Sequence, residues 1–159
     1  MQDSEKVTNV IIAGLGGQGV LKASNILSAA AFKAGYDVKK SEIHGMSQRG
    51  GSVTSDVRFG KKVHSPMVPP GQADLLLVLA SDEVEVNRYS LRPQGVLIAP
   101  DAIDATRLAN KRSLNIALLG VLSRHLPIAP EHWIAAIKAN LEPKLHEPNL
   151  QAFELGRQA

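Results

Sequence analysis

Apolar and polar residues follow two different periods along this chain, and these periods predict alternating strands and helices. The later residues of the segment 7–13 are continuously apolar, which is typical of a strand buried on both faces, and a second such strand is expected over 73–80. Between 17 and 34 apolar residues recur at helical spacing, which predicts a helix that ends at Gly35. The next strand is expected over 37–43.

The rest of the pattern predicts a half-exposed strand and several helices. Residues 52–59 alternate small apolar and polar side chains, which is typical of an antiparallel strand at a sheet edge. Further expected elements are helices over 81–91, 114–126, 130–141 and 148–155, a short strand over 96–99, and a polar connector over 100–111. We therefore predict one α/β domain over 1–159, a three-layer fold with a mainly parallel sheet and a Rossmann-like first strand-helix-strand unit. Its ligand crevice is expected at the carboxyl ends of the strands.

A glycine-rich turn separates the first strand from the first helix, and its residues are Gly14, Leu15, Gly16, Gly17, Gln18 and Gly19. Glycines allow positive φ and close approach of the backbone to a ligand, and the helix start favours an anion. The spacing of Gly14, Gly16 and Gly19 satisfies the dinucleotide-binding pattern. The alternative interpretation is a tight turn that lets the helix pack closely.

A second glycine-bounded turn follows the second strand and consists of Gly45, Met46, Ser47, Gln48, Arg49, Gly50 and Gly51. Its polar residues suit the binding of an anion or of carboxylates on a partner. The alternative is a solvated loop. His44 precedes the turn, and a single histidine at a strand end is more often structural than catalytic. The other histidines have no metal-ligand spacing with it, so we expect no metal site.

Composition and charge exclude several functional classes. The net charge is +3 and the basic residues are scattered, which gives no case for nucleic-acid binding. The chain has no cysteine and therefore no disulfide, thiolate zinc site or cysteine-ligated iron-sulfur cluster. A dinucleotide site would also need an acid after the second strand; Glu42 is the nearest, and no substrate domain follows. Without a signal peptide or a long apolar run, a cytoplasmic location is expected.

The two turns together resemble the gamma-type domain of 2-oxoacid:ferredoxin oxidoreductases, and most closely the indolepyruvate-specific beta subunits of that family. The resemblance rests on the runs 14–21, 35–38 and 41–53, and it continues through 57–60, 65–69, 115–120 and 149–156. One departure is the 100–111 stretch, which is shorter than the family pattern.

The resemblance implies an accessory subunit that is inactive alone and has no catalytic residue of its own. A larger partner subunit would carry thiamine diphosphate and iron-sulfur clusters and would oxidise 2-oxoacids such as aryl pyruvates, with coenzyme A as co-substrate and ferredoxin as electron acceptor. In this chain Gly14, Gly16, Gly17, Gln18 and Gly19 would bind a cofactor, and His44, Ser47, Gln48, Arg49, Gly50 and Gly51 would form a composite site or interface. The alternative is a stand-alone nucleotide- or CoA-binding regulatory module.

Overall fold

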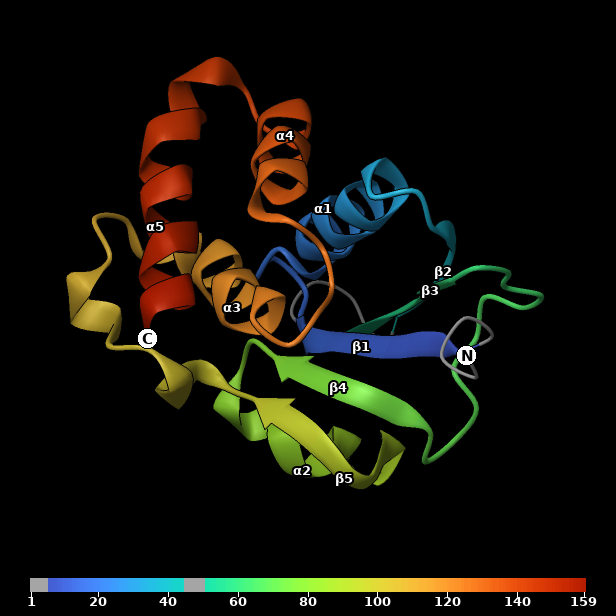
Figure 1. The fold of residues 1–159 in the computed structure, drawn as a ribbon. Coiled ribbons are helices and arrows are strands. Elements are labelled where there is room, and N and C mark those ends of the chain that lie inside the picture. Colours follow the sequence, from blue (N-terminus) through green and yellow to red (C-terminus); the bar gives the residue numbers. More distant parts are fainter. Residues whose placement is uncertain (1–5, 45–50) are drawn as a thin grey trace.

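The computed structural model describes residues 6–44 and 51–159, which form one five-stranded sheet with helices on both faces (Figure 1). The strands are β1 (Val7–Leu15), β2 (Asp37–His44), β3 (Ser52–Gly60), β4 (Ala73–Val78) and β5 (Leu91–Ile98). The α-helices are α1 (Val20–Lys33), α2 (Val84–Asn87), α3 (Leu114–Ser123), α4 (Pro130–Asn140) and α5 (His146–Gln158). Within the described ranges, no helix has the length and apolar character needed to cross a membrane.

The strand order in the sheet is β2-β3-β1-β4-β5. β4 pairs in parallel with β1 and with β5, whereas β3 pairs antiparallel with both β1 and β2. Four strands therefore share one direction and β3 alone opposes them, which confirms the α/β class and the predominant strand direction. The β1-α1-β2 unit has the expected order of elements, but β3 lies between its two strands.

The position of β3 corrects one prediction. The strand is antiparallel as expected, but it lies inside the sheet instead of at an edge. Two of its polar side chains bond to the loop that follows it. The Asp56 carboxylate accepts a hydrogen bond from the backbone N–H of Val68 at 2.9 Å, and Arg58 donates to the carbonyl of Ser65 at 2.9 Å. The alternating pattern thus reflects a polar face satisfied by a loop, not a face exposed to water.

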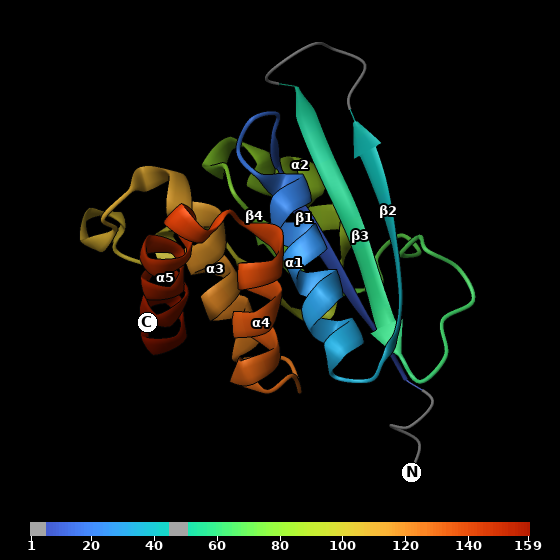
Figure 2. The same cartoon turned by 90° about the horizontal axis from the view of Figure 1, so that it is seen from above.

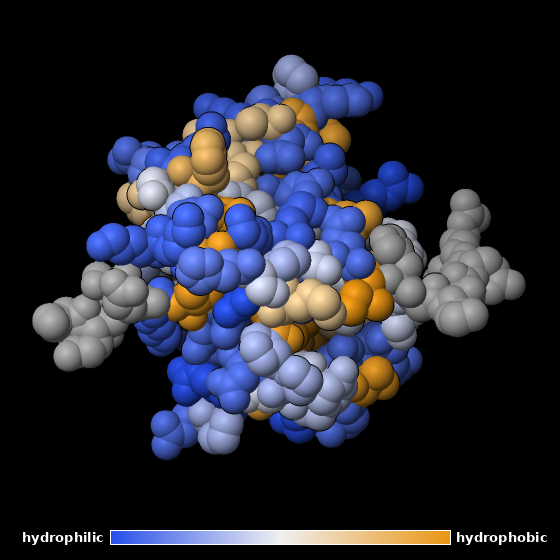
Figure 3. Space-filling model, turned by 90° about the vertical axis from the view of Figure 1, so that its right-hand side faces the viewer, coloured by the Kyte–Doolittle hydropathy of each residue, from blue (hydrophilic) through white to orange (hydrophobic). Residues whose placement is uncertain are grey.

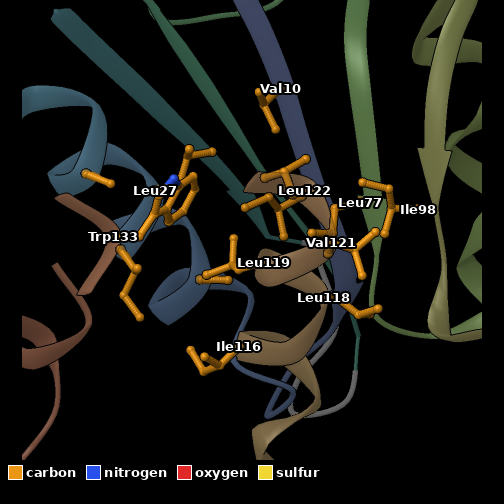
Figure 4. Close-up of a cluster of buried hydrophobic side chains, with 14 of the residues drawn as sticks. Val10, Leu27, Leu77, Ile98, Ile116, Leu118, Leu119, Val121, Leu122 and Trp133 are labelled. Atoms are coloured by element: carbon orange, nitrogen blue, oxygen red, sulfur yellow. The ribbon is translucent and has the colours of Figure 1, made fainter. Parts of the chain in front are cut away.

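The larger core lies on the sheet face covered by α1, α3, α4 and α5 (Figures 1 and 2). α1 contacts β1, β2 and β3, and α3 contacts β4 and β5, while α4 packs against α1 and α5 against α3. Every residue of α3 after Leu114 is buried, because the sheet lies on one side of this helix and α5 on another. Figure 4 shows its side chains between the strands and the fully buried Trp133 of α4.

Two glycines allow α3 and α5 to cross at backbone contact. A Cβ atom on Gly156 would lie 1.8 Å from the carbonyl oxygen of Ala117, and one on Gly120 would lie 2.1 Å from that of Phe153. Neither side chain could be accommodated without moving a helix, since real Cβ atoms do not approach backbone atoms so closely. The crossing therefore fixes the position of α3 against the sheet.

The opposite sheet face carries a smaller core and a thinner cover. The predicted helix over 81–91 is wrong in its extent: it is divided into the four-residue α2 and two flanking 3₁₀ turns, and β5 begins at Leu91, earlier than expected. β5 tolerates Pro93 because it is an edge strand with an irregular register, and Gln94 has φ 69° there. On the face shown in Figure 3, hydrophobic residues form small patches between hydrophilic ones.

The remaining sequence predictions agree closely with the structure. The helices expected over 114–126, 130–141 and 148–155 correspond to α3, α4 and α5, with ends that differ by up to three residues. The polar connector over 100–111 forms short 3₁₀ turns in place of a regular helix. Together these elements position the feature of functional interest, which is the end of the sheet formed by the carboxyl termini of β1 and β4.

Candidate functional site

The glycine turn after β1 and the end of the second glycine-bounded turn meet at one sheet edge. The backbone N–H of Gly16 donates to the carbonyl of Gly51 at 2.8 Å, and Leu15 pairs with Ser52 in the ladder between β1 and β3. β3 starts where β1 ends because the two strands are antiparallel neighbours. The sheet topology thus places Gly51, the last residue of the second predicted turn, beside the glycine turn.

The glycine turn has a backbone conformation that other residues rarely adopt. Gly17 and Gly19 have φ values of 92° and 85°. A Cβ atom on Gly17 would meet nothing within 4 Å, so this residue faces open space. Space is tight at the other end, because a Cβ atom on Gly19 would lie 2.4 Å from Nδ2 of Asn115. Backbone conformation explains the glycine at position 17, and both conformation and lack of space explain the glycine at position 19.

Gln18 braces the turn from within. Its Oε1 atom accepts a hydrogen bond from the N–H of Leu15 at 2.7 Å, and its Nε2 atom donates to the carbonyl of Leu79 at 3.3 Å. The side chain therefore ties the turn to the residue after β4 and points into the protein. In this arrangement the glycine backbone, and not the Gln18 amide, is what the turn presents outwards.

Asn115 holds the turn from the side of α3. Its Nδ2 atom donates to the carbonyl of Gly19 at 3.2 Å, and its Oδ1 atom accepts from the N–H of Ile116 at 2.9 Å. Gly19 is the N-terminal cap of the 14-residue α1, and no side chain caps this helix. The N–H groups of its first turn have no partner within the helix and carry the positive end of its dipole.

A cavity of 540 Å³ lies beside the turn, between Gly17–Gly19, Leu79 and the start of α3. Lys111 and Arg112 contribute to its wall, and both are exposed residues of the connector before α3. A smaller cavity of 250 Å³ lies on the other side of the turn, where Lys22 and Val53 line it. The larger cavity combines exposed backbone, two cations and an uncapped helix start, a set of groups that favours an anion.

A buried carboxylate also lies at this rim. Glu83 is 8% exposed, and its Oε1 atom accepts a hydrogen bond from the hydroxyl of Ser52 at 2.7 Å. The same residue receives a hydrogen bond from the Asn87 side chain at its backbone carbonyl. This contact fixes the start of β3 against the 3₁₀ turn that follows β4, so the Gly16–Gly51 contact has a rigid support.

Several residues predicted for the composite site cannot be placed. Ser47, Gln48, Arg49 and Gly50 lie outside the described residues. His44 ends β2, where its backbone is opposite Val53.

Glu42, the acid considered for a dinucleotide ribose, forms a surface ion pair with Lys40. It belongs to β2, which β3 separates from β1. A simple dinucleotide site of the kind weighed in the sequence therefore lacks its acid beside the glycine turn.

The described residues at this rim can bind and orient an anion, but they do not form a catalytic constellation. Within residues 6–44 and 51–159 no three histidine, aspartate or glutamate side chains lie together as metal ligands. The rim provides backbone donors, the cations Lys111 and Arg112, and one carboxylate already engaged by a serine. Such a surface can hold the phosphates of a ligand whose reacting end lies elsewhere.

Sequence reasoning did not assign site roles to Lys111, Arg112, Asn115 or Glu83. Asn115 gave a usable signal, since it is a single amide at the start of an otherwise apolar helix. The adjacent pair Lys111 and Arg112 was visible too, but nothing local predicts that the connector brings it beside a turn almost 100 residues earlier. Glu83 falls in the helix expected over 81–91, whose pattern does not indicate a contact with Ser52.

Comparison with protein families and known proteins gives a consistent result. Residues 9–159 match the pyruvate ferredoxin/flavodoxin oxidoreductase family. The indolepyruvate oxidoreductase subunit IorB of Pyrococcus horikoshii is 36% identical, and the alignment covers 97% of this chain and 96% of that protein. The alignment spans 196 positions, more than the 159 residues of this chain, so that relative has residues that this chain lacks.

Two solved structures share the fold. The gamma subunit of keto/oxoacid ferredoxin oxidoreductase from Geobacter sulfurreducens superposes with a TM-score of 0.80 at 21% identity, over 96% of this chain and 95% of that chain. The 2-oxoglutarate:ferredoxin oxidoreductase from Magnetococcus marinus, solved with 2-oxoglutarate, coenzyme A and succinyl-CoA bound, has a TM-score of 0.79 at 20% identity. The match covers 96% of this chain and 31% of that chain, so the same fold occurs within a longer polypeptide.

Proposed function

The chain belongs to the pyruvate ferredoxin/flavodoxin oxidoreductase family, and on this premise we propose that it is the accessory subunit of an indolepyruvate:ferredoxin oxidoreductase. The observation that carries this proposal is the 36% identity to IorB of P. horikoshii over nearly the full length of both chains. The stand-alone regulatory module considered from the sequence has no such support, since the relative's name describes an oxidoreductase subunit. The enzyme would act in the cytoplasm on aryl pyruvates.

The redox chemistry belongs to a larger partner subunit. With no cysteine, this chain cannot supply thiolate ligands to an iron-sulfur cluster, and its sequence shows no thiamine diphosphate motif of the Gly-Asp-Gly type. The partner would hold thiamine diphosphate and the clusters, which together supply decarboxylation and electron transfer to ferredoxin. What remains for this chain is to complete a site or an interface on that partner.

Coenzyme A is the ligand that best suits the glycine rim. Its phosphates would lie against the backbone at Gly17 and Gly19 and beside Lys111 and Arg112, which line the 540 Å³ cavity. Asn115 and Gln18 would act indirectly, because both hold the turn in shape. The M. marinus enzyme, solved with coenzyme A bound, gives the proposal further support. The residues of the second turn, above all Arg49, would contact the partner or the ligand.

Co-purification and activity of the assembled enzyme test this function. The chain should co-purify with the large subunit when the two are expressed together, and the complex should reduce methyl viologen with indolepyruvate and coenzyme A. Pyruvate and 2-oxoglutarate should be poorer substrates, and the isolated chain should be inactive. Robust turnover by the isolated chain, or a complex that prefers 2-oxoglutarate, would contradict the proposal.

The coenzyme A contact can be tested separately with a matched pair of variants. Arg112→Gln removes a cation from the cavity wall, whereas Arg107→Gln removes an exposed cation from the same connector that does not line the cavity. We expect Arg112→Gln to raise the KM for coenzyme A roughly fivefold, the scale of one partly exposed charge pair, without changing the KM for the 2-oxoacid. Equal KM values in both variants would remove Arg112 from the site while leaving the subunit assignment intact.

A further inference from the structure

A larger cavity, of 790 Å³, lies at the opposite edge of the sheet from the glycine turn. Lys6 and Thr8 at the start of β1, Gly60 at the end of β3 and Pro127 in the α3–α4 connection all line it. β1 spans nine residues, which corresponds to roughly 30 Å in an extended strand. The two cavities are therefore separated by the length of the sheet, and the proposed coenzyme A contact does not explain this one.

The floor of this cavity is apolar, and its aromatic part is held in place. Phe59, Leu75 and Leu126 belong to the buried core and line the cavity. The ring of Tyr36 packs against that of Phe59 with centroids 5.2 Å apart, and the Tyr36 hydroxyl donates to the carbonyl of Pro127 at 3.4 Å. Phe59 is 1% exposed and holds Tyr36 from below, so the partly exposed Tyr36 ring is the aromatic surface that a flat ligand ring can contact.

The rim of the cavity is positively charged. Lys6, Lys61 and Arg92 line it together with one carboxylate, that of Asp74. Asp74 is already engaged, since Arg92 Nε donates to its Oδ1 atom at 2.7 Å and the N–H of Asn9 donates to its Oδ2 atom at 2.8 Å. Lys6 also lies 4.0 Å from Asp74 Oδ1, so Asp74 engages two of the three cations, and Lys61 is the lining cation outside this pairing. The rim keeps an excess of positive charge above an apolar floor.

We propose that this cavity binds a small aromatic carboxylate, with the ring against Tyr36 and the carboxylate beside Lys61. The volume is in the range of sites that enclose small organic ligands. A polyphosphate would leave the apolar floor without a partner, and a neutral hydrocarbon would gain nothing from the cations. The proposal does not depend on the assignment as an oxidoreductase subunit, because it rests only on the residues of this cavity.

Calorimetric titration of the purified full-length chain with indole-3-acetate tests the proposal. We expect saturable binding, and binding of the neutral analogue indole-3-acetamide at least fivefold weaker, because the analogue lacks the charge. Lys61→Gln should weaken indole-3-acetate binding roughly fivefold, whereas Lys62→Gln should leave it within about twofold. Lys62 is the matched control, since it is an exposed lysine next in sequence that does not line the cavity.

Amide chemical shifts then locate the bound ligand. The proposal expects the largest changes at Gly35, Gly60 and Lys61. Absence of saturable binding, equal affinity for the acetamide, equal effects of the two lysine variants, or changes centred on Gly17 and Gly19 would each overturn it. So would loss of binding when the large subunit is added, because the cavity would then be covered by a protein partner.

Discussion

The close crossing of α3 and α5 predicts that Gly156→Ala destabilises the protein, although alanine is the better helix former. The new Cβ atom would lie 1.8 Å from the Ala117 carbonyl oxygen and 3.0 Å from the Cα of Gly120. Relief of that overlap requires the helices to separate by more than 1 Å. Overpacking of this kind costs about 1–3 kcal/mol, and a severe overlap belongs at or above the top of that range. The higher helix propensity of alanine offsets about 1 kcal/mol of this cost, so we expect the free energy of unfolding to fall by about 2 kcal/mol.

Urea unfolding followed by tryptophan fluorescence measures this loss. Trp133 is the only tryptophan, is fully buried in α4, and packs against Phe153 of α5 at 5.6 Å between ring centroids. A loss of about 2 kcal/mol should lower the melting temperature by roughly 4–8 °C in a chain of this size. Gln151→Ala, at an exposed position of α5, is the control and should stay within about 0.5 kcal/mol of wild type. If Gly156→Ala is as stable as wild type or more stable, α3 and α5 do not approach each other as closely as described.

Three further predictions concern the sheet and the rim. Burial raises the pKa of Asp56 above its usual 3.8, so ionisation of this carboxyl lowers the stability of the fold as the pH rises through the folded-state pKa. Asp56→Asn can still accept the hydrogen bond from Val68, so it should be more stable than wild type at pH 7 and equal to it below about pH 3. Thermal melts across this pH range check the prediction. Asn115→Asp keeps the shape of the side chain but cannot donate a hydrogen bond to the carbonyl of Gly19. The variant should lower the free energy of unfolding in urea by about 1–3 kcal/mol and raise the KM for coenzyme A in the assembled enzyme. Unchanged values would show that the turn does not depend on this hydrogen bond. Arg49→Ala should weaken assembly or coenzyme A binding by about 2–5 kcal/mol if the guanidinium contacts a buried carboxylate or phosphate, and Arg49→Lys should recover only part of this loss. Titration of each variant into the large subunit measures the effect. Wild-type behaviour of both variants would show that Arg49 makes no such contact.

Periodicity predicted most elements of this fold because their burial is set by local sequence. The runs Val10–Ala13 of β1 and Leu75–Val78 of β4 are continuously apolar, and both strands lie in the interior of the sheet. The spacing of apolar residues in α1 likewise matches the face that it buries. The helix predicted over 81–91 is interrupted for a local reason as well. Glu83 and Asn87 are buried, and the Asn87 side chain donates to the Glu83 carbonyl. The segment therefore forms short turns and not a continuous amphipathic helix.

The neighbours of β3 could not be read from its alternating pattern, because alternation reports that one face is polar and not what covers it. Here the loop after β3 supplies an N–H to Asp56 and a carbonyl to Arg58. The site shows the same limit. The glycine turn was visible as a motif, and a rim shared with the second turn was expected. Its contact with Gly51 depends on the pairing of β1 with β3, which the sequence did not predict. The contribution of Arg112 depends on a contact between distant segments, which no local pattern encodes.

The central place of β1 constrains the order in which the chain can fold during synthesis. Its two neighbours in the sheet, β3 and β4, both come later in the sequence, and β2 joins only through β3. The apolar residues Val10 to Ala13 therefore remain unpaired until residues 54–57 of β3 have been made, and they gain their second neighbour only with residues 75–78 of β4. At translation rates of about 5–20 residues per second, this strand is exposed for seconds, and α1 is the element formed early enough to shield one of its faces.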